Sequence, residues 1–369
     1  MVLLCGLACP IGRLGQKESS SSPTNLLNIP RELRDEIFTL VLTHRHPSPK
    51  TPAEVEAQTR TWGGGGWSSS DLVSYLQNPR AYDTNAAGLL STSTQLRIET
   101  EDVLKRLDLT HELDIKFVNE RYLAPTWILI HTKPLHFKRV HVVLQSIGAW
   151  QVPAQRMKHS ARDPWFPGNG GPPGYVWLFY NTLMHFLRWG ISGPQNTDHS
   201  IDVCVERLEL DFVDPENTEL LPPLDKFANL QMARCQRARS ARFSNEAHGP
   251  ELLQPELLAR DLTSSMLYLF GMDYHAAEYA ELLHERIGEM VFLVNGALMQ
   301  QLDVGQILAD LEFNNSFSNV RRDYRVDTWI DWKEKAQLGR KKRGLKTVGF
   351  KDGWQDQART AAAQYYARR

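Results

Sequence analysis

Residues 208–212 read Leu208-Glu209-Leu210-Asp211-Phe212, and this alternation of large apolar and acidic residues decides the fold class. Successive side chains of a β-strand point to opposite faces, so the pattern predicts a strand with one buried face and one polar face. The same period of two recurs in residues 113–117 and 140–144, and residues 127–130 are a fourth candidate strand. We therefore expect half-buried strands that form an antiparallel sheet.

Helices are expected in the segments of the sequence between and after these strands. Residues 176–189 are apolar on nearly all sides, which predicts a buried helix, and residues 255–270 and 276–287 have helical patterns. The pair Asn295-Gly296 suits a type I′ turn, so residues 290–302 are predicted to form a hairpin. Asp303 then caps a short helix whose apolar residues lie between 304 and 311.

The segment from Leu26 to Leu42 carries the clearest helical stripe. Leu33, Ile37, Leu40 and Val41 are spaced at i, i+4, i+7 and i+8, and Pro30 suits the first turn of the helix. A second helix is predicted around residues 89–104, where large apolar residues recur every seven positions. Residues 43–80 between the two helices are rich in Gly and Pro and predict a long loop.

Composition excludes several classes of protein. The 369 residues include 42 Lys plus Arg and 43 Asp plus Glu, a net charge of -1, so the surface as a whole is not built for nucleic acid or anionic membranes. The four cysteines, Cys5, Cys9, Cys204 and Cys235, are too few and scattered for a disulfide framework and favour an intracellular, cytoplasmic or nuclear location. No stretch approaches the roughly 20 apolar residues that a membrane span needs, so no membrane partner is expected.

No residue pattern predicts catalysis. His131, His136 and His141 are five residues apart, which places neighbours on opposite faces of a strand, and no Cys or carboxylate completes a metal site. The glycines of residues 168–174 lack the Lys that a phosphate loop needs. We expect no catalytic residue, no metal and no cofactor, and an enzyme without a readable motif is one alternative.

The C-terminal extension differs from the rest of the chain in charge. From Arg321 onward it holds 14 Lys plus Arg and six acids, a net charge of +8. Its densest part, Arg340-Lys341-Lys342-Arg343, has the composition of a nuclear-import or nucleic-acid patch. The tryptophans Trp329, Trp332 and Trp354 either stack on bases or fold back on the body of the protein.

Two short segments resemble a known family. Residues 27–38, Leu-Asn-Ile-Pro-Arg-Glu-Leu-Arg-Asp-Glu-Ile-Phe, and residues 89–101 resemble the divergent F-box-like family common in filamentous fungi. The resemblance implies a three-helix module that docks on the adaptor subunit of a cullin-based ubiquitin ligase, while the rest of the chain holds a substrate. It also implies the docking positions, which are Ile29, Pro30, Leu33, Ile37 and Leu40. If the stripe is instead buried, it closes the core of the β-containing body.

The sequence thus predicts an α+β protein with F-box-like N-terminal helices packed on a mixed α/β body. We expect a disordered segment at 1–24, the helical region at 25–105, the body at 106–313 and a basic, partly helical extension at 314–369. The expected function is non-catalytic protein–protein interaction, with an adaptor subunit and an unknown substrate as partners. A nuclear, nucleic-acid-associated protein that uses the basic extension is the second expectation.

Overall fold

The computed structural model describes residues 26–61, 73–149, 172–191, 201–221, 252–272, 277–314, 321 and 324–367. The segment 1–24, which we expected to be disordered, lies outside these residues, as do Cys5, Cys9 and Cys235. Cys204 is buried and has a free thiol. Within the described ranges, no helix combines the length and the apolar character that crossing a membrane requires.

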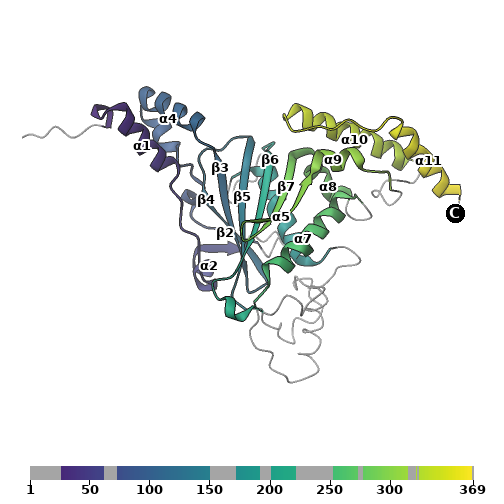
Figure 1. Cartoon of the computed structure of the whole chain (residues 1–369), viewed down its shortest axis with the longest axis horizontal. Coiled ribbons are helices and arrows are strands. Elements are labelled where there is room, and N and C mark those ends of the chain that lie inside the picture. The colour runs from purple at the N-terminus through teal and green to yellow at the C-terminus, as the bar shows by residue number, and fades with distance from the viewer. Residues whose placement is uncertain are drawn as a thin grey trace, which may run out of the picture.

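A six-stranded mixed sheet forms the centre of the molecule (Figure 1). Its strands are β3 (Thr110–Val118), β4 (Tyr122–Leu129), β5 (His136–Ile147), β6 (Cys204–Val213), β7 (Ile287–Val294) and β8 (Ala297–Asp303). Their spatial order is β4-β3-β5-β6-β7-β8. The α+β class is confirmed, and the antiparallel pairs that we expected are β3–β4 and β7–β8 at the two edges. The four inner strands are parallel, so the sheet as a whole is mixed.

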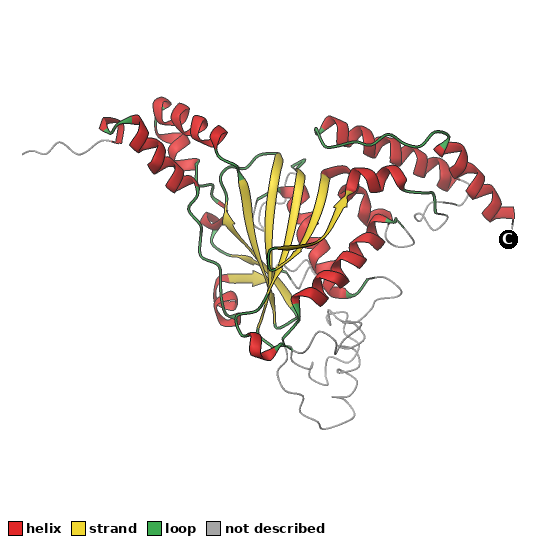
Figure 2. Cartoon of the chain, in the orientation of Figure 1, coloured by secondary structure: helices red, strands yellow, loops and turns green. Residues whose placement is uncertain are grey.

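Helices cover one face of this sheet (Figure 2). They are α5 (Gly174–Trp189), α7 (Pro255–Phe270) and α8 (Ala277–Arg286), close to the predicted ranges. Leu113, Val142, Leu208 and Phe292 point into the core beneath them. The opposite face carries the charged residues of each alternation. Parallel strands are usually covered on both faces and read as continuous apolar runs. Among the described residues, the second face carries polar side chains such as Lys116, Glu209 and Asp211 along these strands, so the sequence alternates as in an antiparallel sheet.

The predicted hairpin and the short helix after it are both present. Asn295 and Gly296 join β7 to β8 with φ values of 50° and 78°, the left-handed conformation that a type I′ turn requires. Helix α9 (Val304–Asp310) follows at once, and its cap is the Asp303 carboxylate, which accepts a hydrogen bond from the Gln306 amide at 3.0 Å.

An N-terminal helical unit lies beside the β4 edge of the sheet (Figure 1). It contains the turn η1 (Leu26–Asn28) and the helices α1 (Arg31–Leu42), α3 (Ala87–Thr92) and α4 (Thr94–Arg106). The second predicted helix is therefore split in two, because the Ser93 hydroxyl caps α4 by accepting from the Leu96 amide at 3.2 Å. Phe38, Leu42, Leu96 and Val103 form the core of the unit.

The loop predicted at 43–80 is wrong over part of its length. The segment contains α2 (Pro52–Gln58), the strand pair β1 (Thr59–Thr61) and β2 (Ser74–Leu76), and the turn η3 (Pro79–Tyr82). Pro52 begins α2, where a missing N–H costs nothing, and Thr51 caps it. Val55 then buries its side chain against Val118 and Ile147 of the sheet.

The C-terminal extension is helical and packs on the body beside the β8 edge (Figure 1). It consists of α10 (Arg325–Lys342) and α11 (Trp354–Ala367). Outside the extension, one further turn, η5 (Thr218–Leu220), follows β6 in the body. Trp329 and Trp332 are buried, and Trp354 packs on the same apolar cluster. The interpretation that these tryptophans fold back on the body is confirmed.

Candidate functional site

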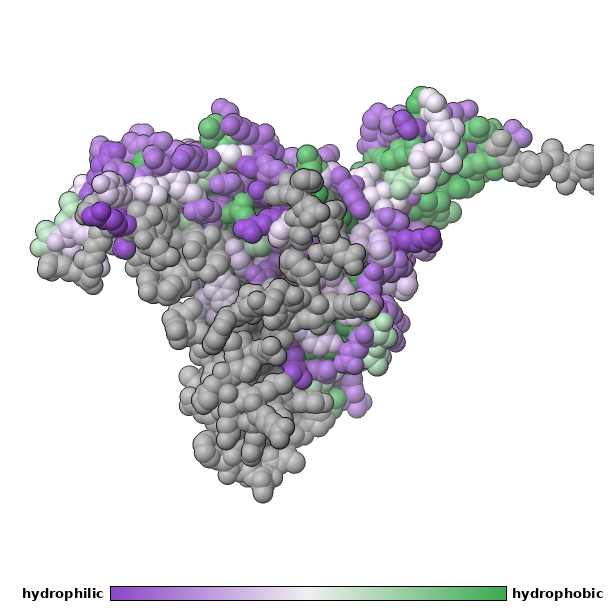
Figure 3. Space-filling view, turned by 180° about the vertical axis from the view of Figure 1, so that it is seen from behind, coloured by the Kyte–Doolittle hydropathy of each residue, from purple (hydrophilic) through white to green (hydrophobic). Residues whose placement is uncertain are grey.

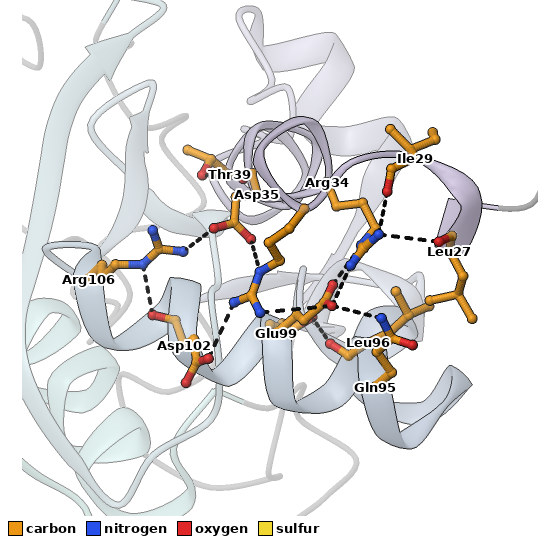
Figure 4. Close-up of polar contacts among 12 residues, drawn as sticks. Leu27, Ile29, Arg34, Asp35, Thr39, Gln95, Leu96, Glu99, Asp102 and Arg106 are labelled. Carbon is orange, nitrogen blue, oxygen red and sulfur yellow. Dashed lines mark hydrogen bonds and ion pairs between the residues drawn. The ribbon is translucent and has the colours of Figure 1, made fainter.

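The inward face of α1 anchors the helix to α4. Phe38 and Leu42 are fully buried, and Arg34 lies one turn before them on the same face. The Arg34 guanidinium donates two hydrogen bonds to the Glu99 carboxylate, at 2.8 and 2.6 Å, and further ones to the carbonyl oxygens of Leu27 and Ile29 (Figure 4). The hydrogen bonds from Arg34 lower the pKa of Glu99 against the opposing effect of burial. Arg34 therefore ties the turn before α1, α1 itself and α4 together.

A second row of ion pairs lies along the same interface (Figure 4). Asp35 accepts from Arg106 at 2.6 Å and from Arg31 at 2.9 Å, and Arg31 also reaches Asp102 at 3.3 Å. These partners, with Arg106 contributing most, lower the pKa of Asp35. Because alternating charges cross between the helices, the register of α1 on α4 is fixed.

The apolar stripe of α1 faces away from this interface. Leu33 is 50% exposed and Leu40 is 71% exposed, while Val41 and Pro30 are also exposed and Ile29 and Ile37 are half-buried. Of the two interpretations of the stripe, a core position is therefore wrong for Leu33 and Leu40. Seen from behind, apolar surface gathers on the α1–α4 unit, whereas most of the other described surface is hydrophilic (Figure 3). Such a patch is typical of a surface that binds a partner.

An open groove adjoins the stripe. It has a volume of about 480 Å³ and lies between α1 and α4, where Leu40, Val103 and Leu107 supply apolar contacts and Asp35 and Arg106 supply charge. The stripe and the groove together give α1 an apolar ridge beside an apolar recess. This shape suits the insertion of a partner's side chains.

A polar joint attaches the end of α1 to the sheet. The Leu42 carbonyl oxygen accepts from Asn85 Nδ2 at 3.1 Å and lies 2.9 Å from His131 Nδ1. The other ring nitrogen of His131 lies 3.1 Å from the Thr110 carbonyl oxygen, at the start of β3. Burial lowers the pKa of His131. The joint fixes the direction in which α1 leaves the body, and no motif in the sequence indicates it.

The three histidines that are spaced five residues apart do not converge on one site. His131 belongs to this joint, His136 contacts Glu206 at 2.6 Å, and His141 contacts Glu209 at 3.1 Å. Among the described residues, no group of three His, Cys, Asp or Glu side chains is arranged to hold a metal ion.

Charged residues on the open face of the sheet pair with one another. Glu209 is 2% exposed and accepts from Arg207 at 2.7 Å, from Arg139 at 2.9 Å and from His141. Burial opposes its ionised form, but the hydrogen bonds from Arg139, Arg207 and His141 outweigh burial and lower the pKa of Glu209. The Glu209 carboxylate is thus already neutralised by its neighbours within the sheet.

The predicted basic patch is divided by the fold. Arg340 is fully buried and donates to carbonyl oxygens of the body, and Arg343 forms a two-pronged contact with Asp202, with both oxygens 2.8 Å from its Nη2. Only Lys341 and Lys342 are exposed. Spacing along the sequence cannot distinguish these roles, because adjacent residues of a helix point in different directions. The four residues do not form one free basic surface.

A lysine lies at the centre of the aromatic cluster in the extension. The Lys333 ammonium donates to the carbonyl oxygens of Leu311 at 2.7 Å and Ala309 at 3.1 Å. It lies 5.1, 4.7 and 4.9 Å from the ring centroids of Trp329, Phe350 and Trp354. Burial lowers the pKa of Lys333 to about 8. These rings stabilise a cation of the same chain, so nucleic-acid bases do not stack on them in this conformation.

Buried histidines predict a loss of stability in acid. Burial, followed by the charges of Arg340 and Lys333, lowers the pKa of His284 to about 4. The unfolded chain takes up this proton near pH 6.5, whereas the folded chain resists it until about pH 4. As the pH is lowered between these values, the free energy of unfolding decreases by about 2 to 3 kcal/mol for this one residue.

Urea unfolding at pH 7.5 and pH 4.5 measures this effect. In His284→Gln the difference between the two pH values shrinks by the same amount, because Gln does not titrate. Burial also lowers the pKa values of His111 and His185 to about 4, so these residues account for part of the difference that remains between the two pH values. An unchanged difference in the variant would contradict the assignment of the effect to His284.

Comparison of the chain with protein families, with curated proteins and with solved structures gives no match.

Proposed function

We propose that this chain is a non-catalytic interaction protein whose helix α1 docks on a protein partner and whose body holds a substrate. The partner that we propose is the adaptor subunit of a cullin-type ubiquitin ligase. The outward position of Leu33 and Leu40 supports docking, because both side chains lie outside the core and Leu40 lines the groove between α1 and α4. The choice of adaptor rests on the resemblance of residues 27–38 and 89–101 to the F-box-like family.

The anchoring of α1 supports the same proposal. A docking helix transmits the position of its partner to the body only if it is held rigidly. Arg34, Phe38 and the joint at Leu42 hold α1 from its first turn to its last. The proposal places the protein in the cytoplasm or nucleus, where ligases of this class act.

Two variants separate docking from folding. In Leu33→Asp and Leu40→Asp, the new carboxylate is placed in solvent and not in the core, so the melting temperature stays within a few degrees of the parent's. Tagged parent protein retains the adaptor and cullin from a fungal extract, and both variants lose them. The control is Ile98→Asp, which changes an apolar residue that is 54% exposed on α4, outside the stripe.

The outcomes separate the alternatives. Retention by the parent and the control, but not by the two folded variants, supports docking through α1. Absence of adaptor and cullin from all four samples would overturn the proposed partner. A sharp drop in the melting temperature of either variant would show that the stripe belongs to the core.

A further inference from the structure

Residues 43–51 cross from α1 to the sheet and form a segment that we call the strap. Residues 44–50 lie in neither helix nor strand. The His46 amide donates to the Ile128 carbonyl oxygen at 2.8 Å, and Arg45 pairs with Glu112 at 2.6 Å. Ser48, in the middle of the strap, donates its hydroxyl hydrogen to the Asp114 carboxylate. The strap is thus fastened to β3 and β4 by side-chain and main-chain contacts.

The acceptor of the Ser48 hydrogen bond is a buried carboxylate. Asp114 is 2% exposed, and its oxygen Oδ2 lies 2.9 Å from Lys116 Nζ. Lys116 is also buried and donates to Gln145 Oε1 at 2.7 Å. The Lys116 ammonium is therefore committed to two partners, and Ser48 satisfies Asp114 with a neutral donor. A negative group in place of the hydroxyl would lie against Asp114, and the single positive charge of Lys116 is already balanced by that carboxylate.

We propose that Ser48 is a phosphorylation site and that its modification releases the strap from the sheet. Ser48 is followed by Pro49 and Lys50 and preceded by Pro47, in a segment without regular structure, which is a sequence that proline-directed protein kinases can bind in extended form. The kinase transfers the γ-phosphoryl group of MgATP to Ser48 Oγ. An O–P bond forms there, the bond to the leaving ADP breaks, and the hydroxyl proton passes to the kinase's base and then to solvent.

Electrostatics give the modification its effect. A phosphoserine carries about -1.5 to -2 charges at pH 7 and has lost the hydrogen that Asp114 accepts. Closing the strap over the modified residue would bring this charge against a buried carboxylate, so the closed state is disfavoured. Transient opening exposes Ser48 to the kinase, and the phosphate then prevents reclosure.

The consequence is a change in how α1 is held. The strap is the direct chain connection from α1 to α2, and Arg45 and His46 lose their partners when it opens. Asn85 Nδ2 also donates to the His44 carbonyl oxygen at 2.8 Å, and opening of the strap breaks this contact as well. This inference concerns the strap itself and does not depend on the identity of the partner of α1.

The test uses the full chain. Purified protein is incubated with a proline-directed kinase and MgATP, the modified residue is located by mass spectrometry, and amide hydrogen exchange is followed in the strap. We expect phosphate on Ser48 and exchange of the His46 amide that is about tenfold faster than in the unmodified protein. The melting temperature of the sheet stays within a few degrees of its unmodified value, because the strap lies outside the main core.

Variants identify the cause of the change. Ser48→Glu reproduces faster exchange in part, and combining it with Asp114→Asn restores slow exchange, because the repelling carboxylate is gone. Ser91→Glu is the control, since Ser91 is exposed and bonds only to its own helix on α3. Two results would overturn the proposal: phosphate on Thr51, which also precedes a proline, in place of Ser48, or phosphate on Ser48 with unchanged exchange of the His46 amide.

Discussion

Arg340→Ala is expected to lower the free energy of unfolding by about 3 to 5 kcal/mol, one of the two largest effects that we foresee for a single substitution. Arg340 Nη1 donates to the carbonyl oxygens of His284 and Ile287, both at 2.6 Å, and Nε and Nη2 donate to that of Lys346 at 3.1 and 2.9 Å. Alanine removes these hydrogen bonds from the three carbonyl oxygens. Burial lowers the pKa of Arg340 to about 10, which agrees with its position inside the protein.

Urea unfolding of three variants tests this expectation. Lys341→Ala and Lys342→Ala are the matched controls, because these neighbours are exposed, and each should change the free energy of unfolding by about 0.5 kcal/mol or less. The basic-patch hypothesis predicts the opposite pattern, in which all three variants keep their stability and weaken nucleic-acid binding equally. Parent-like unfolding of Arg340→Ala would show that the side chain does not fasten α10 to the body.

Phe38→Ala is expected to cost about 3 to 5 kcal/mol, as removal of a buried phenyl ring usually does. The ring is fully buried among Leu42, Leu96 and Val103, and these residues form most of the core of the N-terminal unit. Because this cluster is separate from the core under α5 and α7, we expect α1 and α4 to lose protection before the sheet does.

Hydrogen exchange of α1, α4 and the central strands measures the two parts separately. Leu33→Ala is the matched control on the same helix, and its half-exposed side chain should contribute about 0.5 kcal/mol or less. Equal loss of protection in Leu33→Ala and Phe38→Ala would mean that both faces of α1 are buried, which would contradict the orientation of the helix.

The sequence predicts which residues of a strand face inward, but not the order of the strands. The alternation of residues 208–212 correctly places Leu208 and Phe212 in the core. The parallel order of β3, β5, β6 and β7 depends on long crossovers between the strands, and these leave no local pattern in the strand residues. The alternation seen in β6 is therefore compatible with either direction of pairing.

Helix α1 shows why a stripe alone does not identify the buried face. Leu33, Ile37 and Leu40 follow helical spacing, yet Arg34, Phe38 and Leu42 at i, i+4 and i+8 form the face that packs on α4. That second row could have been found in the sequence, but Arg34 is charged and its partner Glu99 is 65 residues away. Pairing of a buried charge with a distant residue is decided by the tertiary structure.

Prolines and adjacent charges account for the other differences between the predicted and the observed structure. Pro47, Pro49 and Pro52 predict a loop, whereas Pro52 begins α2 and Val55 fixes that helix to the sheet. In the run 340–343, identical charge hides the fact that one side chain is buried and one is paired. Ser48 and Asp114 carry no sequence signal for each other, since only the fold brings them together.

The most direct test of the central claim is a binding measurement with purified components. Isothermal titration of the chain with the purified adaptor subunit should give a measurable affinity for the parent and for Ile98→Asp. Leu33→Asp and Leu40→Asp should bind at least about 100-fold more weakly, as substitutions at the centre of an interface do, while their melting temperatures stay close to the parent's. Equal binding by the parent and both variants, or no binding by the folded parent, would contradict docking through the outward face of α1.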